Sequence, residues 1–362
     1  MSDLSGFRDS DRVKGLAKRI HEIYPGGEHK LMEVCGTHTM AIARYGLRSL
    51  LPEGLVLLSG PGCPVCVTPS AVIDAAVKIS EQPDAAVVTF GDMMSVPGSH
   101  GSLELRKSEG ADIRVLYSVY DMLEMAQNET EKQFVFISVG FETTTPGTAL
   151  AVLETKKRGL GNVYFLAANR LVIPAMDMLM RAEEVRIGGF ICPGHVSVII
   201  GSDAYRELSD QYRVPCAVAG FEPVDILLAI SDLVQQIGEE RSEVSNCYSR
   251  AVTLKGNTEA QRVTDLVFER VEAEWRGIGR IPSSGLALRP EFREVDALHR
   301  FEMELVPVAE PPGCRCGDVL KGLLLPPQCG LFGKRCTPQH PVGPCMVSSE
   351  GSCSAFFKYE DI

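Results

Sequence analysis

Short apolar runs alternate along the chain with segments of helical periodicity. The runs are rich in valine, isoleucine, leucine, phenylalanine and alanine and occupy residues 55–60, 85–91, 113–119, 133–140, 162–170, 188–194 and 215–221. Each is followed by a stretch in which apolar residues recur every three or four positions. This alternation predicts an α/β protein in which parallel strands are joined by crossover helices.

Two short sequences within these runs are alike. Val139–Glu142 reads VGFE and Ala219–Glu222 reads AGFE, and each is expected to end a buried strand and open a helix. We interpret the likeness as two related parallel-sheet α/β domains, a first over residues 1–125 and a second over residues 126–255.

The pattern changes near residue 256. A charged helical stretch is predicted over residues 258–275, followed by a region rich in proline, glycine and cysteine with few strand signals. A third, irregular and mainly helical domain is therefore expected over residues 256–362. Its core is poor in aliphatic residues, so a metal centre would supply the missing stabilisation.

Composition and charge narrow the class of protein. The 362 residues are 45% hydrophobic and carry a net charge of -11, which gives no basic field for a nucleic acid partner. The first residues are polar, and the uncharged run over residues 54–73 is broken by glycines and prolines. We expect a cytoplasmic protein with no transmembrane helix and no membrane partner.

Glycine- and proline-rich loops follow the predicted strands. In open parallel sheets the ligand site lies at the carboxyl ends of the strands, so polar residues in these loops are candidates for it. Ordinary turn chemistry is the alternative for each loop. The candidates are Asp92, His100, Glu142, Thr143 and His195.

The first cysteine motif is Cys35-Gly-Thr-His-Thr. The thiol of Cys35 is expected near a helix N-terminus, where its pKa should be lowered, with Thr37 or Thr39 capping the helix. With His38 it would bind a soft metal or attack an electrophile. A buried cysteine beside a structural histidine is the alternative.

The second motif is Cys63-Pro-Val-Cys66, placed at a helix start. This spacing favours either a reversible disulfide or two ligands of one metal. Together with Cys35 and His38, the pair would complete a closed zinc site.

The third group comprises six cysteines near the C-terminus. Four of them, Cys314, Cys329, Cys336 and Cys353, are typical in spacing of a [4Fe-4S] cluster, with structural zinc as the alternative. Cys316 and Cys345 remain as a thiol pair near the cluster or as competing ligands. Cys192, Cys216 and Cys247, in mid-chain, are expected to pack in the interior.

Taken together, these motifs resemble the HypD family of hydrogenase formation proteins over nearly the whole chain. The resemblance rests on the segments 32–39 (MEVCGTHT), 61–70 (GPGCPVCVTP), 140–146 (GFETTTP), 192–197 (CPGHVS), 275–286 (WRGIGRIPSSGL) and 343–353 (GPCMVSSEGSC).

The resemblance implies an assembly scaffold more than a turnover enzyme. With a small HypC-type chaperone, such a protein holds an iron that bears two cyanides and one carbon monoxide, Fe(CN)2CO, for nickel-iron hydrogenase. A HypE-type partner supplies the cyanides, and the hydrogenase large subunit precursor is involved only indirectly. Cys35 matches the family cysteine that ligates this iron, and Cys63 and Cys66 would be a redox pair served by the cluster, with His38 supporting the site.

Two other classes of function compete with this interpretation. The cysteine pattern is also consistent with an independent thiol-disulfide oxidoreductase that uses the cluster, or with a zinc-structured interaction protein. A nucleotide-dependent enzyme is disfavoured because neither GxxxxGK[ST] nor a GxGxxG after a strand occurs.

Overall fold

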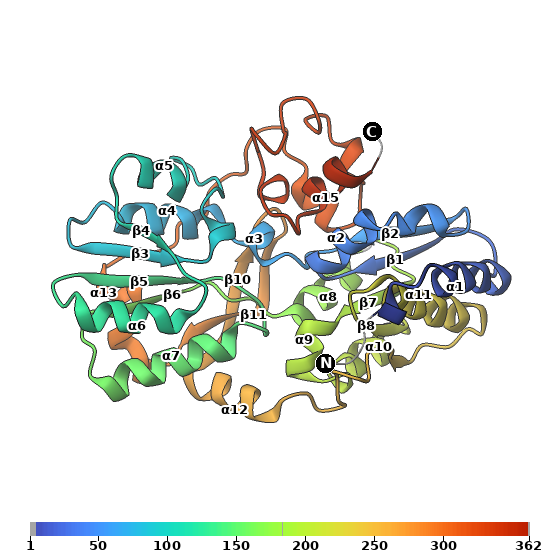
Figure 1. Ribbon diagram of the computed structural model, residues 1–362, viewed down its shortest axis with the longest axis horizontal. Coiled ribbons are helices and arrows are strands. Elements are labelled where there is room, and N and C mark those ends of the chain that lie inside the picture. The colour runs from blue at the N-terminus through green and yellow to red at the C-terminus, as the bar shows by residue number, and fades with distance from the viewer. Residues whose placement is uncertain (1–4, 183, 361–362) are drawn as a thin grey trace.

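Two parallel sheets lie in the two halves of the molecule in a computed structural model, which describes residues 5–182 and 184–360 (Figure 1). The larger sheet has the order β2-β1-β7-β8-β9, and all its neighbours are parallel. Its strands are β1 (His29–Glu33), β2 (Leu55–Ser59), β7 (Gly189–Pro193), β8 (Cys216–Ala219) and β9 (Val244–Asn246).

The smaller sheet has four parallel strands in the order β4-β3-β5-β6. They are β3 (Ala85–Thr89), β4 (Ile113–Val115), β5 (Gln133–Ser138) and β6 (Val163–Ala167). All five residues of β3 are buried, because helices cover both faces of the sheet. The predicted α/β class with parallel sheets is confirmed, and each predicted apolar run contains a strand.

Helices cover the sheets as the crossover pattern requires. On the five-stranded sheet, α1 (Ser10–Ile23), α2 (Gly36–Arg44) and α11 (Pro223–Gly238) share one core, and α8 (Val172–Arg181), α9 (Gly194–Ile200) and α10 (Arg206–Tyr212) contribute to another. On the four-stranded sheet, α6 (Val119–Asn128), α7 (Thr145–Arg158) and α12 (Thr258–Val267) cover one face, and α4 (Ser70–Ile79) and α5 (Leu103–Ser108) cover the other. None of the described helices has the length and apolar character needed to cross a membrane.

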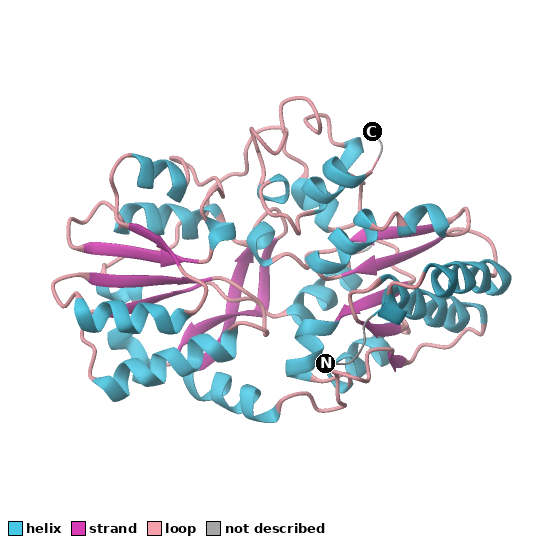
Figure 2. Ribbon diagram, in the orientation of Figure 1, coloured by secondary structure: helices cyan, strands magenta, loops and turns pink. Residues whose placement is uncertain are grey.

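The division of the chain between the sheets differs from the predicted boundaries. Residue 125 falls between β4 and β5, which belong to one sheet, and β1 and β2 pair with the late strand β7 rather than with β3. The chain therefore builds part of the five-stranded sheet, leaves to build the four-stranded sheet, and returns. Figure 2 shows the strand arrows of both sheets turned toward the middle of the molecule.

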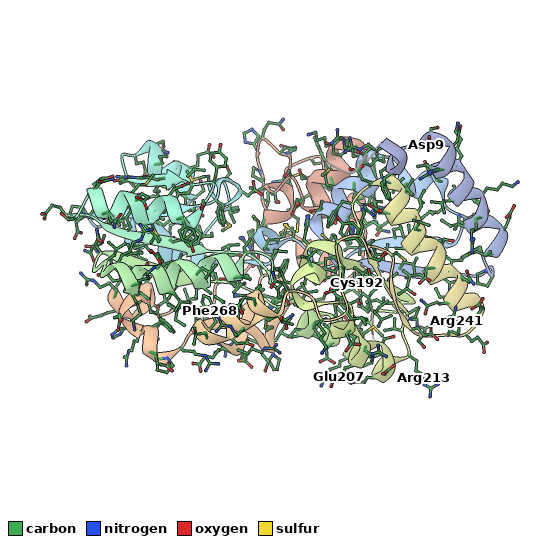
Figure 3. The ribbon with its side chains drawn as sticks, turned by 60° about the horizontal axis from the view of Figure 1, so that its bottom comes forward. Asp9, Cys192, Glu207, Arg213, Arg241 and Phe268 are labelled. Atoms are coloured by element: carbon green, nitrogen blue, oxygen red, sulfur yellow. A yellow bond between two sulfur atoms is a disulfide. The ribbon has the colours of Figure 1, made fainter. Side chains whose placement is uncertain are left out.

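The region after residue 256 also differs from the expectation. Of the stretch 258–275 that was predicted to be helical, only Thr258–Val267 is a helix, and the following residues form an antiparallel hairpin of β10 (Phe268–Trp275) and β11 (Gly279–Leu288). Phe268 and Leu286 of this hairpin belong to the core of the four-stranded sheet, so these residues are not a separate irregular unit. Figure 3 shows Phe268 in that half of the molecule and Cys192 in the other.

The cysteine-rich region that follows is irregular, as predicted. Short elements alternate with turns: α13 (Ala297–Arg300), α14 (Cys316–Leu320) and α15 (Ser352–Tyr359), with the 3-10 helices Pro290–Val295, Pro326–Gln328 and Pro344–Met346. The last helix, α15, packs against α2, and Arg48 fixes it by stacking over Phe356 and pairing with Glu360. This contact brings the C-terminal region to the carboxyl end of β1.

Candidate functional site

Cys35 lies at the point where β1 gives way to α2. It is the N-cap residue of α2, as the sequence predicted, and only 6% of its surface is exposed. The backbone N–H of Gly36 donates to the carbonyl of Gly62, 2.9 Å away, which ties this turn to the loop after β2. The thiol is free, in contrast to those of Cys63 and Cys66.

Gly62 permits this close approach of the two loops. A β-carbon at Gly62 would overlap the backbone of Val34 and Cys35. The atoms that this β-carbon would meet all belong to the backbone, which cannot move aside as a flexible side chain could. The close packing of the two loops therefore depends on glycine at this position.

We therefore expect Gly62→Ala to lower the free energy of unfolding by at least about 2 kcal/mol, because the added methyl group meets backbone. Urea unfolding followed by circular dichroism measures this. Gly161→Ala is the matched control, since a β-carbon there meets nothing within 4 Å. Equal stability of the two variants would contradict the proposed close packing of the loops.

Cys63 and Cys66 form a disulfide beside this turn, with their α-carbons 5.2 Å apart. Cys63 is the N-cap of the short helix α3 (Pro64–Val67), and both cysteines are buried. One of the two chemistries predicted for the CxxC motif is therefore present. While this disulfide is in place, Cys63 and Cys66 offer no thiolates to the alternative closed zinc site with Cys35 and His38.

His38 is held by groups that follow β8, two strands away from β1 in the five-stranded sheet. Its Nε2 lies 2.8 Å from the carbonyl oxygen of Gly220, and its ring lies 5.0 Å from that of Phe221, which stacks on His195 at 3.9 Å. Burial lowers the pKa of His38 to about 4, so the imidazole is neutral at pH 7. Because Nε2–H donates to the carbonyl, Nδ1 is the bare nitrogen, and it has no partner among the described residues.

The pKa of Cys35 differs in direction from the expectation. Backbone N–H groups of His38 and Thr37 do favour the thiolate, as predicted for a helix N-terminus. Burial acts more strongly, and the carboxyl groups of Glu350 and Glu33 add to it, so the pKa rises to about 12. The thiol of the free protein is therefore protonated at neutral pH.

The two threonines of this motif do not cap α2. Thr37 Oγ1 donates to Glu350 Oε1 at 2.6 Å, and Thr39 Oγ1 donates to Glu33 Oε1 at the same distance. Glu33 also accepts the backbone N–H of Cys35 at 3.3 Å through its other oxygen. Both threonines therefore orient carboxyl groups around Cys35 instead.

Glu33 and Glu350 are site residues that the sequence reasoning missed. Glu33 is fully buried, and burial raises its pKa to about 7. Glu350 reaches the site from the C-terminal region, where burial and the nearby Asp92 raise its pKa. Both lie in motifs that carried the family resemblance, but nothing in the sequence indicated that residues 33 and 350 meet at Cys35.

The other candidates from the strand ends divide into two groups. Asp92 lies close enough to Glu350 to raise its pKa, and His195 stacks on Phe221, whose ring neighbours that of His38. His100 and Thr143 are exposed, His100 in the turn that joins Gly98 and Gly101. Glu142 is buried and lines a cavity that contains none of the residues around Cys35 described above.

The C-terminal cysteines gather around one small pocket. The four predicted cluster ligands all line it, together with Cys316: they are Cys314, Cys329, Cys336 and Cys353. Gly343 packs against the sulfurs of Cys314 and Cys316, where a β-carbon would come within 2.6 Å of both. Cys345 does not line the pocket, although its thiol contacts that of Cys316. As arranged, no three His, Cys, Asp or Glu side chains of the described chain could hold a single metal ion.

The fold and these groups define an α/β protein that holds a buried thiol, a disulfide and a cysteine-lined pocket around the ends of its parallel strands. The sequence pattern described as "HypD: Hydrogenase formation hypA family" matches residues 11–360. The chain is 44% identical to the hydrogenase maturation factor HypD of Cupriavidus necator over 99% of its own length and 97% of that protein. It is also 44% identical to the HypD proteins of Azotobacter vinelandii, covering 99% of this chain and 97% of that one, and of Escherichia coli, covering 91% and 89%.

The chain therefore belongs to the HypD family of hydrogenase maturation factors. The predicted family resemblance is confirmed.

Proposed function

We propose that this protein is a scaffold on which the Fe(CN)2CO unit of nickel-iron hydrogenase is assembled, with Cys35 as the ligand that it contributes. The observation that carries the proposal is the placement of Cys35. Its free thiol lies at the end of β1, enclosed by the Cys63–Cys66 disulfide loop, by His38 and by Glu350.

The chemistry of the cargo suits this thiol. Low-spin Fe(II) with cyanide and carbon monoxide is a soft centre, and thiolate is the soft ligand that a protein offers. Because the pKa of Cys35 is about 12, iron binding must release its proton, and Glu33, with a pKa near 7, hydrogen-bonds the backbone of the same residue. His38, which is neutral at pH 7, would make a second interaction, either with the iron unit or with the thiolate of Cys35.

The cysteine-lined pocket fits an iron-sulfur cluster in donor chemistry. Cys314, Cys329, Cys336 and Cys353 line it together and would hold a [4Fe-4S] cluster, with Cys316 next to them. When bound, such a cluster supplies one-electron transfer. Cys63 and Cys66 are the dithiol that this protein contributes, since their disulfide takes up two electrons and two protons on reduction.

The partners follow from the same proposal. A HypC-type chaperone would share the iron with Cys35, a HypE-type protein would deliver the cyanides, and the hydrogenase large subunit precursor would meet the product indirectly. We place this assembly in the cytoplasm.

The disulfide favours a second candidate, an independent thiol-disulfide oxidoreductase. The two candidates differ in what they need, because an oxidoreductase turns over a protein disulfide with no chaperone present. Cys35 would then be dispensable, whereas the scaffold requires it.

Infrared spectra of the protein co-purified anaerobically with its HypC-type chaperone test the proposal. Cyanide and carbonyl stretching bands are expected for the wild type and should be absent from Cys35→Ala. Cys247→Ala is the matched control, because this half-buried free cysteine packs on the core of the five-stranded sheet directly after β9, three strands from β1. Bands that persist in Cys35→Ala would overturn the role of this thiol.

A further inference from the structure

Glu142 is a buried carboxyl group that the proposed assembly site does not use. It follows β5 in the GFETTT segment, and only 8% of its surface is exposed. Its Oε1 accepts the backbone N–H of Val172 at 3.0 Å. Its Oε2 is buried and has no hydrogen-bond partner among the described residues.

An unpartnered carboxyl oxygen in the interior is unfavourable, because its lost hydration is not replaced. The burial raises the pKa of Glu142 to about 7, and the nearby Arg270 partly opposes this. Native proteins satisfy nearly all such groups through protein atoms, ordered water or a ligand, so this oxygen is available to a partner that enters from a neighbouring cavity.

A cavity of about 210 Å³ lies in front of this carboxyl group. It is formed where α9, α12 and β11 approach the loop after β5, between the two sheets. Apolar side chains make much of its wall: Leu171, Ile199, Ile200, Ala204 and Leu286. Thr145, Gln261 and Thr264 add polar atoms, and the exposed residues Asp265 and Arg270 complete the lining.

We propose that this cavity binds a small organic molecule that donates an amino or carboxamide N–H group to Glu142 and packs a short apolar portion against Leu171, Ile199 and Leu286. A ligand that donates is complementary to the ionised form of Glu142, in which Oε2 can only accept. An apolar portion is accommodated because the five apolar side chains of the wall offer no hydrogen bond. The volume suits a ligand of only a few non-hydrogen atoms.

This site is distinct from the one at Cys35. None of the residues that line the cavity hydrogen-bonds to Cys35, His38 or Glu350, and the wall comes largely from α9, α12 and the β10–β11 hairpin. The inference therefore goes beyond the proposed assembly function and does not depend on it.

Ligand-observed NMR titrations of the full-length protein test the proposal with three probes. The probes are n-butylamine, butyramide and 2-pentanone, which has nearly the shape of butyramide but no N–H donor. We expect butyramide or n-butylamine to bind at least about tenfold more tightly than 2-pentanone. Equal binding of all three, or no binding of either donor, would overturn the site.

Variants identify the group that receives the donor. Glu142→Gln should weaken n-butylamine at least about tenfold, because it removes the charge from the hydrogen bond, and should weaken butyramide less. If Glu142→Gln weakens the binding of n-butylamine more than that of butyramide, the ligand class is an ammonium compound. If the wild type binds butyramide more tightly than n-butylamine, the ligand class is a carboxamide.

Two further variants keep this test decisive. Glu272→Gln, on the exposed part of β10, should leave binding unchanged. Ala204→Leu should block both donors by filling the cavity while leaving Glu142 in place. Unchanged binding in Glu142→Gln and Ala204→Leu would show that the probes bind elsewhere and would refute the assignment.

Discussion

Cys336→Ser is expected to leave anaerobically purified protein with less than about one iron per chain, against about four in the wild type. Cys336 is buried, lines the cysteine pocket, and lies close enough to Cys314 and Cys353 to affect their pKa values. Its backbone carbonyl accepts from Gly333, so the loop that carries it is ordered around the pocket. Iron and sulfide analysis, with visible absorption near about 400 nm, measures the loss.

The same change should destabilise the C-terminal region, because a metal centre supplies folding free energy where few aliphatic side chains do. Hydrogen exchange over residues 314–359 should therefore rise in Cys336→Ser. Cys345→Ser is the matched control: this cysteine is fully buried but does not line the pocket, and about four irons should remain. Zinc in place of iron in the wild type would rule out the cluster and favour a structural site.

Cys63→Ala is expected to reduce hydrogenase maturation to background while the absorption of the C-terminal cluster stays intact. The physical reason is that a single thiol cannot cycle between dithiol and disulfide, whereas the cluster ligands lie in a different region of the chain. Hydrogenase activity of cells that depend on the variant, together with the visible spectrum of the purified protein, measures the two effects separately.

The control for this variant is Cys247→Ala, which removes a free thiol outside the site. Loss of both maturation and the cluster in Cys63→Ala would indicate a folding role for the disulfide. Normal maturation would refute the redox role of the pair.

The strands were predictable where apolar residues run together and harder to recognise where they do not. Runs such as residues 133–140 and 188–194 become β5 and β7 because buried parallel strands are apolar on both faces. β1, with the sequence HKLME, carries polar residues and was not predicted as a strand. Residues 268–275, FERVEAEW, look helical by composition, but pairing with β11 and burial of Ala273 and Trp275 make them a strand.

The candidate site was predictable one motif at a time. Two features depend only on local spacing and could be predicted: the position of Cys35 at the start of a helix and the pairing of Cys63 with Cys66. The meeting of Glu350 with Thr37 spans most of the chain, and no local pattern encodes it. The pKa of Cys35 was predicted in the wrong direction because helix-end N–H groups are visible in a sequence but burial is not.

The path of the chain between the sheets limits the order in which strands can pair while the protein is being synthesised. The strands of the four-stranded sheet all lie within residues 85–167, so they are available for pairing once that segment has emerged. β1 and β2 are synthesised earlier and can pair with each other. The second neighbour of β1 is β7, which begins only at Gly189, so that pairing forms later. Such distant pairing is slow to form. The turn that carries Cys35 therefore matures late in folding, after more than half of the chain has left the ribosome.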